Sequence, residues 1–389
     1  MQRFTNGSTE FQTHCLTGCI VVPLSSNCAV TFLDFSEDIH VGKVTVKDVA
    51  AAANVSPSTV SNYFNRPARL SDDTRDRIRR AIRDLGFVPN DAARRLRAGT
   101  NPVVGYIAFE LMSAFTPGIA NAIEREVAAR GMHVLMANDT ESTDRERSYI
   151  ELFEMQRVSG LIIAPVGEIE TDLLELKRRG TPSVLSARLA TSDSLASSSA
   201  DGILGGYLAV SHLLEIGCRR VAFVTTSPEL RQMSDRLQGA LRAMDEQRGA
   251  TFEVIQVPER SVGAGAAVAA DIAARAESAR PDALFCANDL LAIGVIQHLA
   301  VHTDIRIPSD VAVIGYDDIE FAASTAVPLS SVRVSAESLG VAAVELLFEE
   351  MELVASARPG ELPDTPSRHI LFEPQLVSRA STLRGGATG

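Results

Sequence analysis

The sequence has no long apolar run and few cysteines, and both features narrow the classes of protein it can represent. No stretch of 18 uncharged apolar residues occurs among the 389 residues, so we expect no membrane-spanning helix. The five cysteines are Cys15, Cys19, Cys28, Cys218 and Cys286. Their spacing is not that of a zinc site, and it does not require an oxidising compartment.

Motifs of common enzyme classes are also missing. We find no nucleophile elbow, no phosphate-loop lysine and no paired catalytic acids. The glycines at 263–268 lack the third small residue of a dinucleotide loop, and we interpret them as a helix start. His298 and His302 are four residues apart, but no glutamate follows His298 and no third metal ligand is evident. We therefore expect no enzyme, no cofactor and no metal site.

The charge is divided unevenly along the chain. The formal net charge is -12, yet residues 43–99 carry 12 Lys and Arg against six Asp and Glu. The remainder carries 25 basic against 43 acidic residues. A basic module on an acidic body indicates a local site for a polyanion such as nucleic acid.

Residues 1–42 carry little structural signal. The letters LTGC at 16–19 are similar to a lipoprotein cleavage box, but the preceding residues are polar and include Glu10. No apolar region of a signal peptide is present. We expect either a disordered extension or upstream sequence included through a misplaced start codon.

Three short helices are predicted in the basic module. Thr45 can cap a helix over 45–53, and Ser56 followed by Pro57 opens a second helix over 57–64. A third helix begins at Ser71 and ends at Gly86. Three helices in this space, the first two joined by a tight turn, indicate a helix-turn-helix.

Strand-like runs alternate with amphipathic helices from 103 to 315. The alternation stops and restarts near 202, which predicts two α/β lobes of parallel sheet with helices on both faces. Parallel sheets bind ligands beyond the carboxyl ends of their strands, so a ligand would lie in the cleft between the lobes. The expected division is an extension at 1–42, a DNA-binding domain at 43–89, a hinge at 90–101 and a two-lobed domain at 102–389.

Several motifs resemble the LacI/GalR family of bacterial transcription regulators, over about residues 43–383. They are VKDVA at 46–50, VSPSTVS at 55–61, LGFVPN at 85–90, AND at 287–289 and IPSDVAVIGYDD at 307–318. The resemblance implies a regulator, most simply a repressor, that binds operator DNA as a homodimer under the control of a small-molecule effector. It also implies a cytoplasmic protein.

The resemblance assigns DNA-binding residues to the second helix and the hinge. Residues expected at base edges or phosphates of the major groove are Lys47, Ser56, Pro57, Ser58, Thr59, Ser61 and Asn62. The alternative for Ser56 and Pro57 is helix capping alone, and for Asn62 a solvated side chain. In the hinge, Asn90 and Ala93 accompany Leu96, which would wedge between base pairs in the minor groove.

The resemblance also places effector-binding residues on loops that follow strands. They are Phe115, Arg188, Asp201, Arg236 and Asp289. Carboxylates accept pairs of hydroxyls and a guanidinium offers several donors, which suits a sugar-like ligand. The alternative for each residue is a loop cap or a salt bridge.

An exported sugar-binding protein of a transporter is the second hypothesis, because it shares the two-lobed fold. It would need a signal peptide and no helix-turn-helix. Heptads are absent after Arg379, so we expect a dimer without a tetramerising coiled coil.

Overall fold

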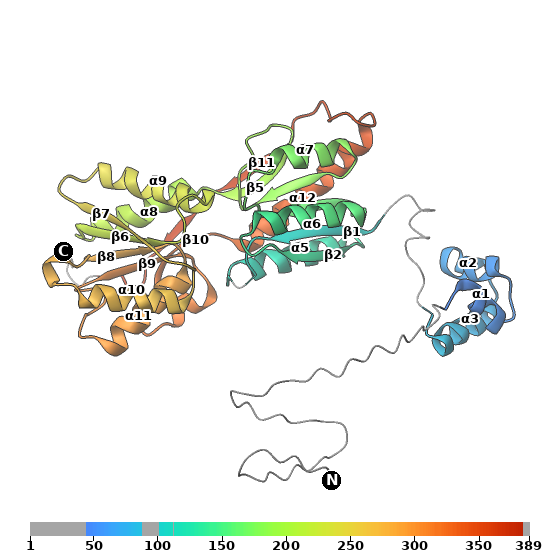
Figure 1. Ribbon diagram of the computed structural model, residues 1–389, viewed down its shortest axis with the longest axis horizontal. Coiled ribbons are helices and arrows are strands. Elements are labelled where there is room, and N and C mark those ends of the chain that lie inside the picture. Colours follow the sequence, from blue (N-terminus) through green and yellow to red (C-terminus); the bar gives the residue numbers. More distant parts are fainter. Residues whose placement is uncertain (1–43, 88–100, 112, 384–389) are drawn as a thin grey trace, which may run out of the picture. The chain divides into compact units, whose positions relative to one another are not determined.

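The structure, a computed structural model, describes residues 44–87, 101–111 and 113–383 (Figure 1). The chain divides into two compact units, Met1–Asp91 and Ala92–Gly389. The predicted hinge residues Asn90, Ala93 and Leu96 lie outside the described residues.

The first unit is a three-helix bundle. Helix α1 spans Val46–Ala52, α2 spans Pro57–Asn65, a short 3-10 helix spans Pro67–Arg69, and α3 spans Asp72–Leu85. The predicted caps are present: Ser56 accepts a hydrogen bond from the Thr59 backbone N–H, and Gly86 ends α3 in the left-handed conformation with φ 62°. The core between the helices consists of Val49, Ala50, Ala53, Val60, Ile78, Ala81 and Phe87.

The second unit contains two lobes, each built on a six-stranded sheet. The sheet of the first lobe has the order β11-β5-β4-β3-β1-β2, and that of the second lobe has the order β12-β10-β9-β8-β6-β7. All pairings are parallel except β10 with β12. This arrangement matches the fold class predicted from the sequence.

The first lobe follows the predicted alternation up to 186, and a strand over 196–200 that was not predicted comes next without an intervening helix. Its elements are β1 (Val103–Ala108), α5 (Thr116–Ala129), β2 (His133–Asn138), α6 (Thr143–Met155), β3 (Gly160–Ile163), α7 (Glu170–Arg178), β4 (Ser183–Ser186) and β5 (Ala196–Ala200).

The second lobe repeats the pattern. Its elements are α8 (Gly202–Glu215), β6 (Arg220–Thr225), α9 (Arg231–Asp245), β7 (Thr251–Gln256), α10 (Val262–Ala274), a 3-10 helix (Glu277–Ala279), β8 (Ala283–Cys286), α11 (Asp289–His302), β9 (Ala312–Asp317), a 3-10 helix (Glu320–Ser324) and β10 (Ser330–Arg333).

The chain then returns to the first lobe and back again. Helix α12 (Ala336–Ser356) packs against α5 and the strands of the first lobe, and β11 (His369–Phe372) pairs with β5. Strand β12 (Gln375–Val377) pairs with β10 in the second lobe. Three chain segments therefore join the two lobes, as Figure 1 shows between the two sheets.

Two glycines allow α8 and α9 to cross with their backbones in close approach. A Cβ atom at Gly206 would overlap the carbonyl oxygen of Arg236, and one at Gly239 would overlap that of Ile203. The crossing positions the start of α9, and therefore Arg236, beside the start of α8.

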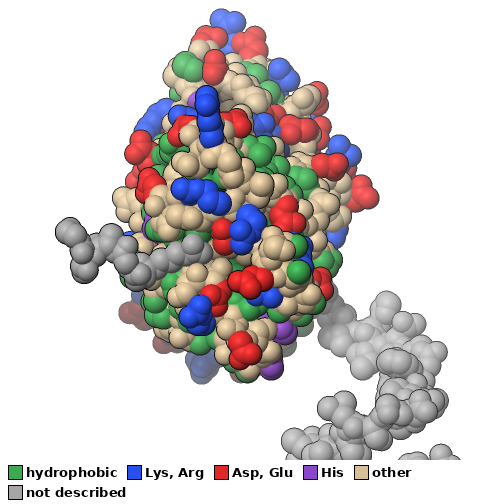
Figure 2. Space-filling view, turned by 90° about the vertical axis from the view of Figure 1, so that its left-hand side faces the viewer, with side chains coloured by type: hydrophobic (Ala, Val, Ile, Leu, Met, Phe, Trp, Pro, Cys, Tyr) green, Lys and Arg blue, Asp and Glu red, His purple; other side chains and the backbone are tan. Residues whose placement is uncertain are grey.

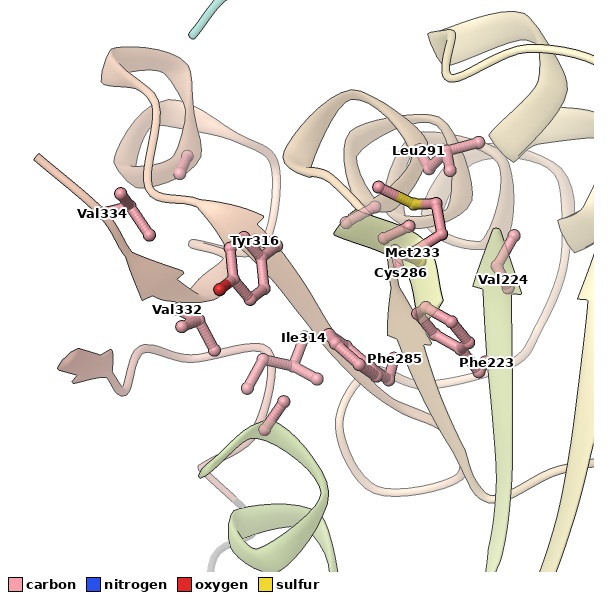
Figure 3. Packing of buried hydrophobic residues seen from close by; sticks show 14 of the residues in the cluster. Phe223, Val224, Met233, Phe285, Cys286, Leu291, Ile314, Tyr316, Val332 and Val334 are labelled. Carbon is pink, nitrogen blue, oxygen red and sulfur yellow. The ribbon is translucent and has the colours of Figure 1, made fainter. Parts of the chain in front are cut away.

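Aromatic side chains fill the core of the second lobe across neighbouring strands. The rings of Phe223 on β6 and Phe285 on β8 are stacked with centroids 4.7 Å apart, and Tyr316 on β9 lies 6.5 Å beyond Phe285 (Figure 3). All three are buried. Phe285 therefore packs against Tyr316, which lies near the end of β9 and lines a cavity between the lobes.

Candidate functional site

A cavity of about 320 Å³ lies between the two lobes. Residues at or beyond the carboxyl ends of β1, β4 and β5 line it from the first lobe, and residues beyond β7 and β8 and at the end of β9 line it from the second. Among them are Tyr106, Phe109, Phe115, Arg188, Asp201, Arg236, Arg260, Asn288, Tyr316 and Asp317. Its position agrees with the expectation that ligands bind at the carboxyl ends of parallel strands.

The structure brings four of the five predicted effector residues together around this cavity: Phe115, Arg188, Asp201 and Arg236. Two of them also make the structural contacts named as alternatives. Asp201 caps α8 by accepting from the Leu204 backbone N–H at 2.8 Å, and Arg188 donates to Glu168 at 2.6 Å. These roles orient the side chains and are compatible with ligand contact.

Asp289 does not line the cavity, contrary to our expectation. Its side chain is fully buried, and both carboxylate oxygens accept protein donors: the Ser331 hydroxyl at 2.6 Å and the Ile319 backbone N–H at 2.8 Å. Burial and the nearby Asp317 raise the pKa of Asp289 to about 8. Asp289 therefore connects the start of α11 to the segment after β9, and its neighbour Asn288 lines the cavity instead.

Arg236 is held flat over the end of the aromatic core. Its guanidinium carbon lies 3.6 Å from the centroid of the Tyr316 ring, and Nη1 donates to the Ala287 carbonyl oxygen. Nη2 lies 3.7 Å from the carboxylate of Asp317. Its Nε atom is buried and has no hydrogen-bond partner among the described residues.

Sequence reasoning missed several cavity residues. Tyr106 lies within a strand and fits the pattern of a core residue, and its buried hydroxyl has no partner among the described residues. Asp317 and Asp318 end the motif IPSDVAVIGYDD, and neither was among the predicted cavity residues. Asp318 does pair with Arg333 and Arg379, at 2.7 and 2.6 Å, whereas Asp317 lines the cavity.

The DNA-binding candidates of the first unit lie around the start of α2. Pro57 and Ser58 are exposed, whereas Thr59, Ser61 and Asn62 are half-buried. Ser56 also hydrogen-bonds to the hydroxyls of Ser58 and Thr59, at 2.6 and 2.8 Å. The exposed Lys47 lies on α1.

Two family models match the chain. Residues 45–90 match that of the bacterial regulatory proteins of the lacI family, and residues 210–382 match the periplasmic binding protein-like domain. The chain therefore combines a helix-turn-helix domain of the lacI family with a periplasmic binding protein-like domain.

Named relatives and solved structures agree with this assignment. The HTH-type transcriptional repressor PurR of Aliivibrio fischeri (strain MJ11) is 28% identical over 345 residues, which cover 87% of this chain and 98% of that repressor. The lac repressor dimer bound to operator and the anti-inducer ONPF shares the fold, with a TM-score of 0.69, 24% identity and coverage of 88% of this chain and 99% of that one. The transcriptional regulator CelR in complex with cellobiose has a TM-score of 0.59, 25% identity and coverage of 87% and 99%.

The two-lobed unit carries charges of both signs on its surface. Acidic and basic side chains are interspersed over the face formed by the second lobe (Figure 2), in contrast with the basic excess at 43–99. Within the described ranges, no helix is long and apolar enough to span a membrane. The same residues contain no group of three or more His, Cys, Asp and Glu side chains that could hold a metal ion.

A buried acid that follows β2 predicts a pH-dependent stability. Burial, with the nearby Glu146 and Glu141, raises the pKa of Asp139 from 3.8 to about 7. The folded state therefore binds this proton more tightly than the unfolded state, and the associated stability is lost as the pH rises from about 4 to 7. Asparagine at this position has no such proton. We expect Asp139→Asn to raise the melting temperature relative to wild type by a few degrees at pH 8 and by little at pH 4.

Differential scanning calorimetry across this pH range measures the difference. Asp144→Asn is the matched control. It makes the same chemical change, carboxylate to amide, at an exposed position in the first turn of α6. A difference between Asp139→Asn and wild type that does not change with pH would contradict the assignment.

Proposed function

We propose that the chain is a sequence-specific DNA-binding transcription regulator whose affinity for operator DNA is controlled by a small molecule bound between its two lobes. One observation carries the proposal: the same chain joins a helix-turn-helix unit to a two-lobed unit with a cavity at the strand ends that is lined by apolar, aromatic and charged side chains. The named relatives are repressors, which favours repression as the output.

DNA recognition is assigned to α2 and the hinge. Ser58 and Asn62 can hydrogen-bond to base edges, Pro57 offers an apolar contact, and Lys47 can neutralise a phosphate. Leu96, with Asn90 and Ala93, is proposed from the resemblance to enter the minor groove.

The effector is proposed to be a sugar or a related polyol. Tyr106 Oη and Arg236 Nε are buried polar atoms without partners among the described residues, and buried polar groups are normally hydrogen-bonded. Phe115 adds apolar surface against which a sugar ring can pack. Cellobiose bound to CelR illustrates a sugar in a related protein.

Regulation requires coupling between the two sites. We propose a cytoplasmic homodimer in which ligand changes the angle between the lobes, and thereby the spacing of the paired hinges. The exported sugar-binding protein is disfavoured, because the helix-turn-helix unit has no role in it.

Variants of the first unit separate base recognition from phosphate contact. Replacing Asn62 with alanine should weaken operator binding by about 1–3 kcal/mol and leave binding to unrelated DNA unchanged. Lys47→Gln should weaken both equally and, because the proposed homodimer carries Lys47 twice, reduce the slope of log K against log salt by about two. Fluorescence anisotropy on operator and scrambled duplexes measures both effects, and equal losses for the two variants on both duplexes would contradict the assignment.

A thermal-shift screen of sugars and nucleosides tests the effector site. A ligand at 100 times its dissociation constant stabilises the folded state by roughly 2.7 kcal/mol. The proposal requires that a ligand found in this way also changes the affinity for operator DNA. A ligand that stabilises the protein without any such change would contradict it.

A further inference from the structure

Arg260 extends from the second lobe to the first at the edge of the cavity. It follows β7, and its Nη2 atom forms an ion pair with the carboxylate of Glu141, which follows β2 in the first lobe. The Arg260 guanidinium carbon also lies 5.2 Å from the centroid of the Phe109 ring, beyond β1. One side chain of the second lobe thus contacts two residues of the first.

The second lobe holds its end of this contact in place. Arg260 Nη1 donates to the Thr226 hydroxyl at 3.3 Å, and the Arg260 carbonyl oxygen accepts from the Asn288 side chain at 3.4 Å. Groups of the second lobe therefore orient Arg260 toward the first lobe.

The first lobe holds its end as well. The Glu141 backbone N–H donates to the carboxylate of the buried Asp139 at 3.0 Å and to the Phe109 carbonyl oxygen at 3.3 Å. Thr140 and Glu141 have φ of 51° and 60°, in the left-handed region, where non-glycine residues are uncommon. Two successive residues in this conformation aim the Glu141 side chain at Arg260.

The pair is partly shielded from solvent. The side chain of Arg260 is 10% exposed and that of Glu141 is 30% exposed. An ion pair in such a position interacts more strongly than a pair on the open surface, because the effective dielectric constant is lower.

We infer that the Arg260–Glu141 ion pair is a latch that holds the two lobes closed over the cavity. The inference rests on the proposed function, since it describes how access to the effector cleft is controlled. Arg260 lines the cavity and Glu141 does not. Opening of the pair therefore exposes Arg260. Entry and release of the ligand depend on this opening.

Hydrogen–deuterium exchange of the full-length protein, without ligand or DNA, tests the latch. The reporting segments line the cavity, at 186–189 in the first lobe and 231–236 in the second. We expect Glu141→Gln to speed exchange of both segments about tenfold. The matched control is Glu124→Gln, an exposed acid of α5 in the same lobe, which should leave exchange unchanged.

Two further measurements separate the latch from a loss of folding. Exchange at β8, in the core of the second lobe, should stay at the wild-type rate in every variant. The double variant Glu141→Gln/Arg260→Gln should exchange no faster than the faster single variant, because either substitution removes the same pair.

Exchange in Glu141→Gln equal to that of the Glu124→Gln control would overturn the latch. Additive effects in the double variant, or faster exchange at β8, would also overturn it. These outcomes leave the proposed function untouched, since that is tested by DNA binding. Conversely, a wild-type protein without affinity for a specific DNA sequence would refute the regulator while the exchange result could still hold.

Discussion

Replacing Lys177 with methionine is expected to lower the free energy of unfolding of the two-lobed unit by about 3–5 kcal/mol. Lys177 Nζ lies 2.5 Å from the carboxylate of Glu350, and the two side chains are 1% and 2% exposed. Nζ also donates to the Ser194 carbonyl oxygen at 2.8 Å and to the Ser367 hydroxyl at 3.0 Å. The substitution leaves the Glu350 charge buried without its counter-ion. Urea unfolding followed by circular dichroism measures the loss.

Three variants make this prediction specific. Glu350→Gln should cost a similar amount, because Lys177 then carries the unpaired charge. The double variant Lys177→Met/Glu350→Leu should recover most of the loss, since apolar residues of similar volume often replace a buried pair without penalty. The exposed Arg368–Glu349 pair is the surface control, and Arg368→Met should cost no more than about 1 kcal/mol. A loss below that value for Lys177→Met would contradict the account.

The second large effect is expected at Arg236. Its alanine variant should bind the effector about 10–150 times more weakly, because a hydrogen bond to a charged group contributes about 1.5–3 kcal/mol. Operator DNA should still be bound, and the ligand concentration that changes operator affinity should rise by the same factor. Titrating the sugar or nucleoside identified with the wild-type protein against an operator complex gives both quantities.

Arg242 provides the control on the same helix. Its side chain is 68% exposed and faces away from the cavity lining, so Arg242→Ala should leave the response unchanged. An Arg236→Ala protein that keeps its melting temperature and its full response would remove Arg236 from the effector site.

The local parts of the fold could be predicted from the sequence because they depend on short-range chemistry. Ser56, Ser71 and Gly86 mark helix ends through hydrogen bonding and backbone conformation, and the structure confirms all three. The region after 317 was not divided into elements. Strand β11 pairs with β5, which lies some 170 residues earlier in the chain, and no local periodicity indicates such a partner.

The cavity residues likewise include some that could be predicted from the sequence and some that could not. Asp201 and Arg236 were assigned to the cleft through the family resemblance, and both line the cavity. Asp289 lies at an equivalent place, but Ser331 and Ile319 occupy its oxygens from segments 30 or more residues away. Arg260 has an ordinary loop position in the sequence, and its importance depends on Glu141 in the other lobe.

The central claim is that this protein recognises a specific DNA sequence. Selection of genomic fragments by the purified full-length protein at moderate salt tests it most directly. We expect the recovered fragments to share a near-palindromic site whose half-sites lie about one helical turn apart. Recovery of fragments without any common sequence would contradict the account.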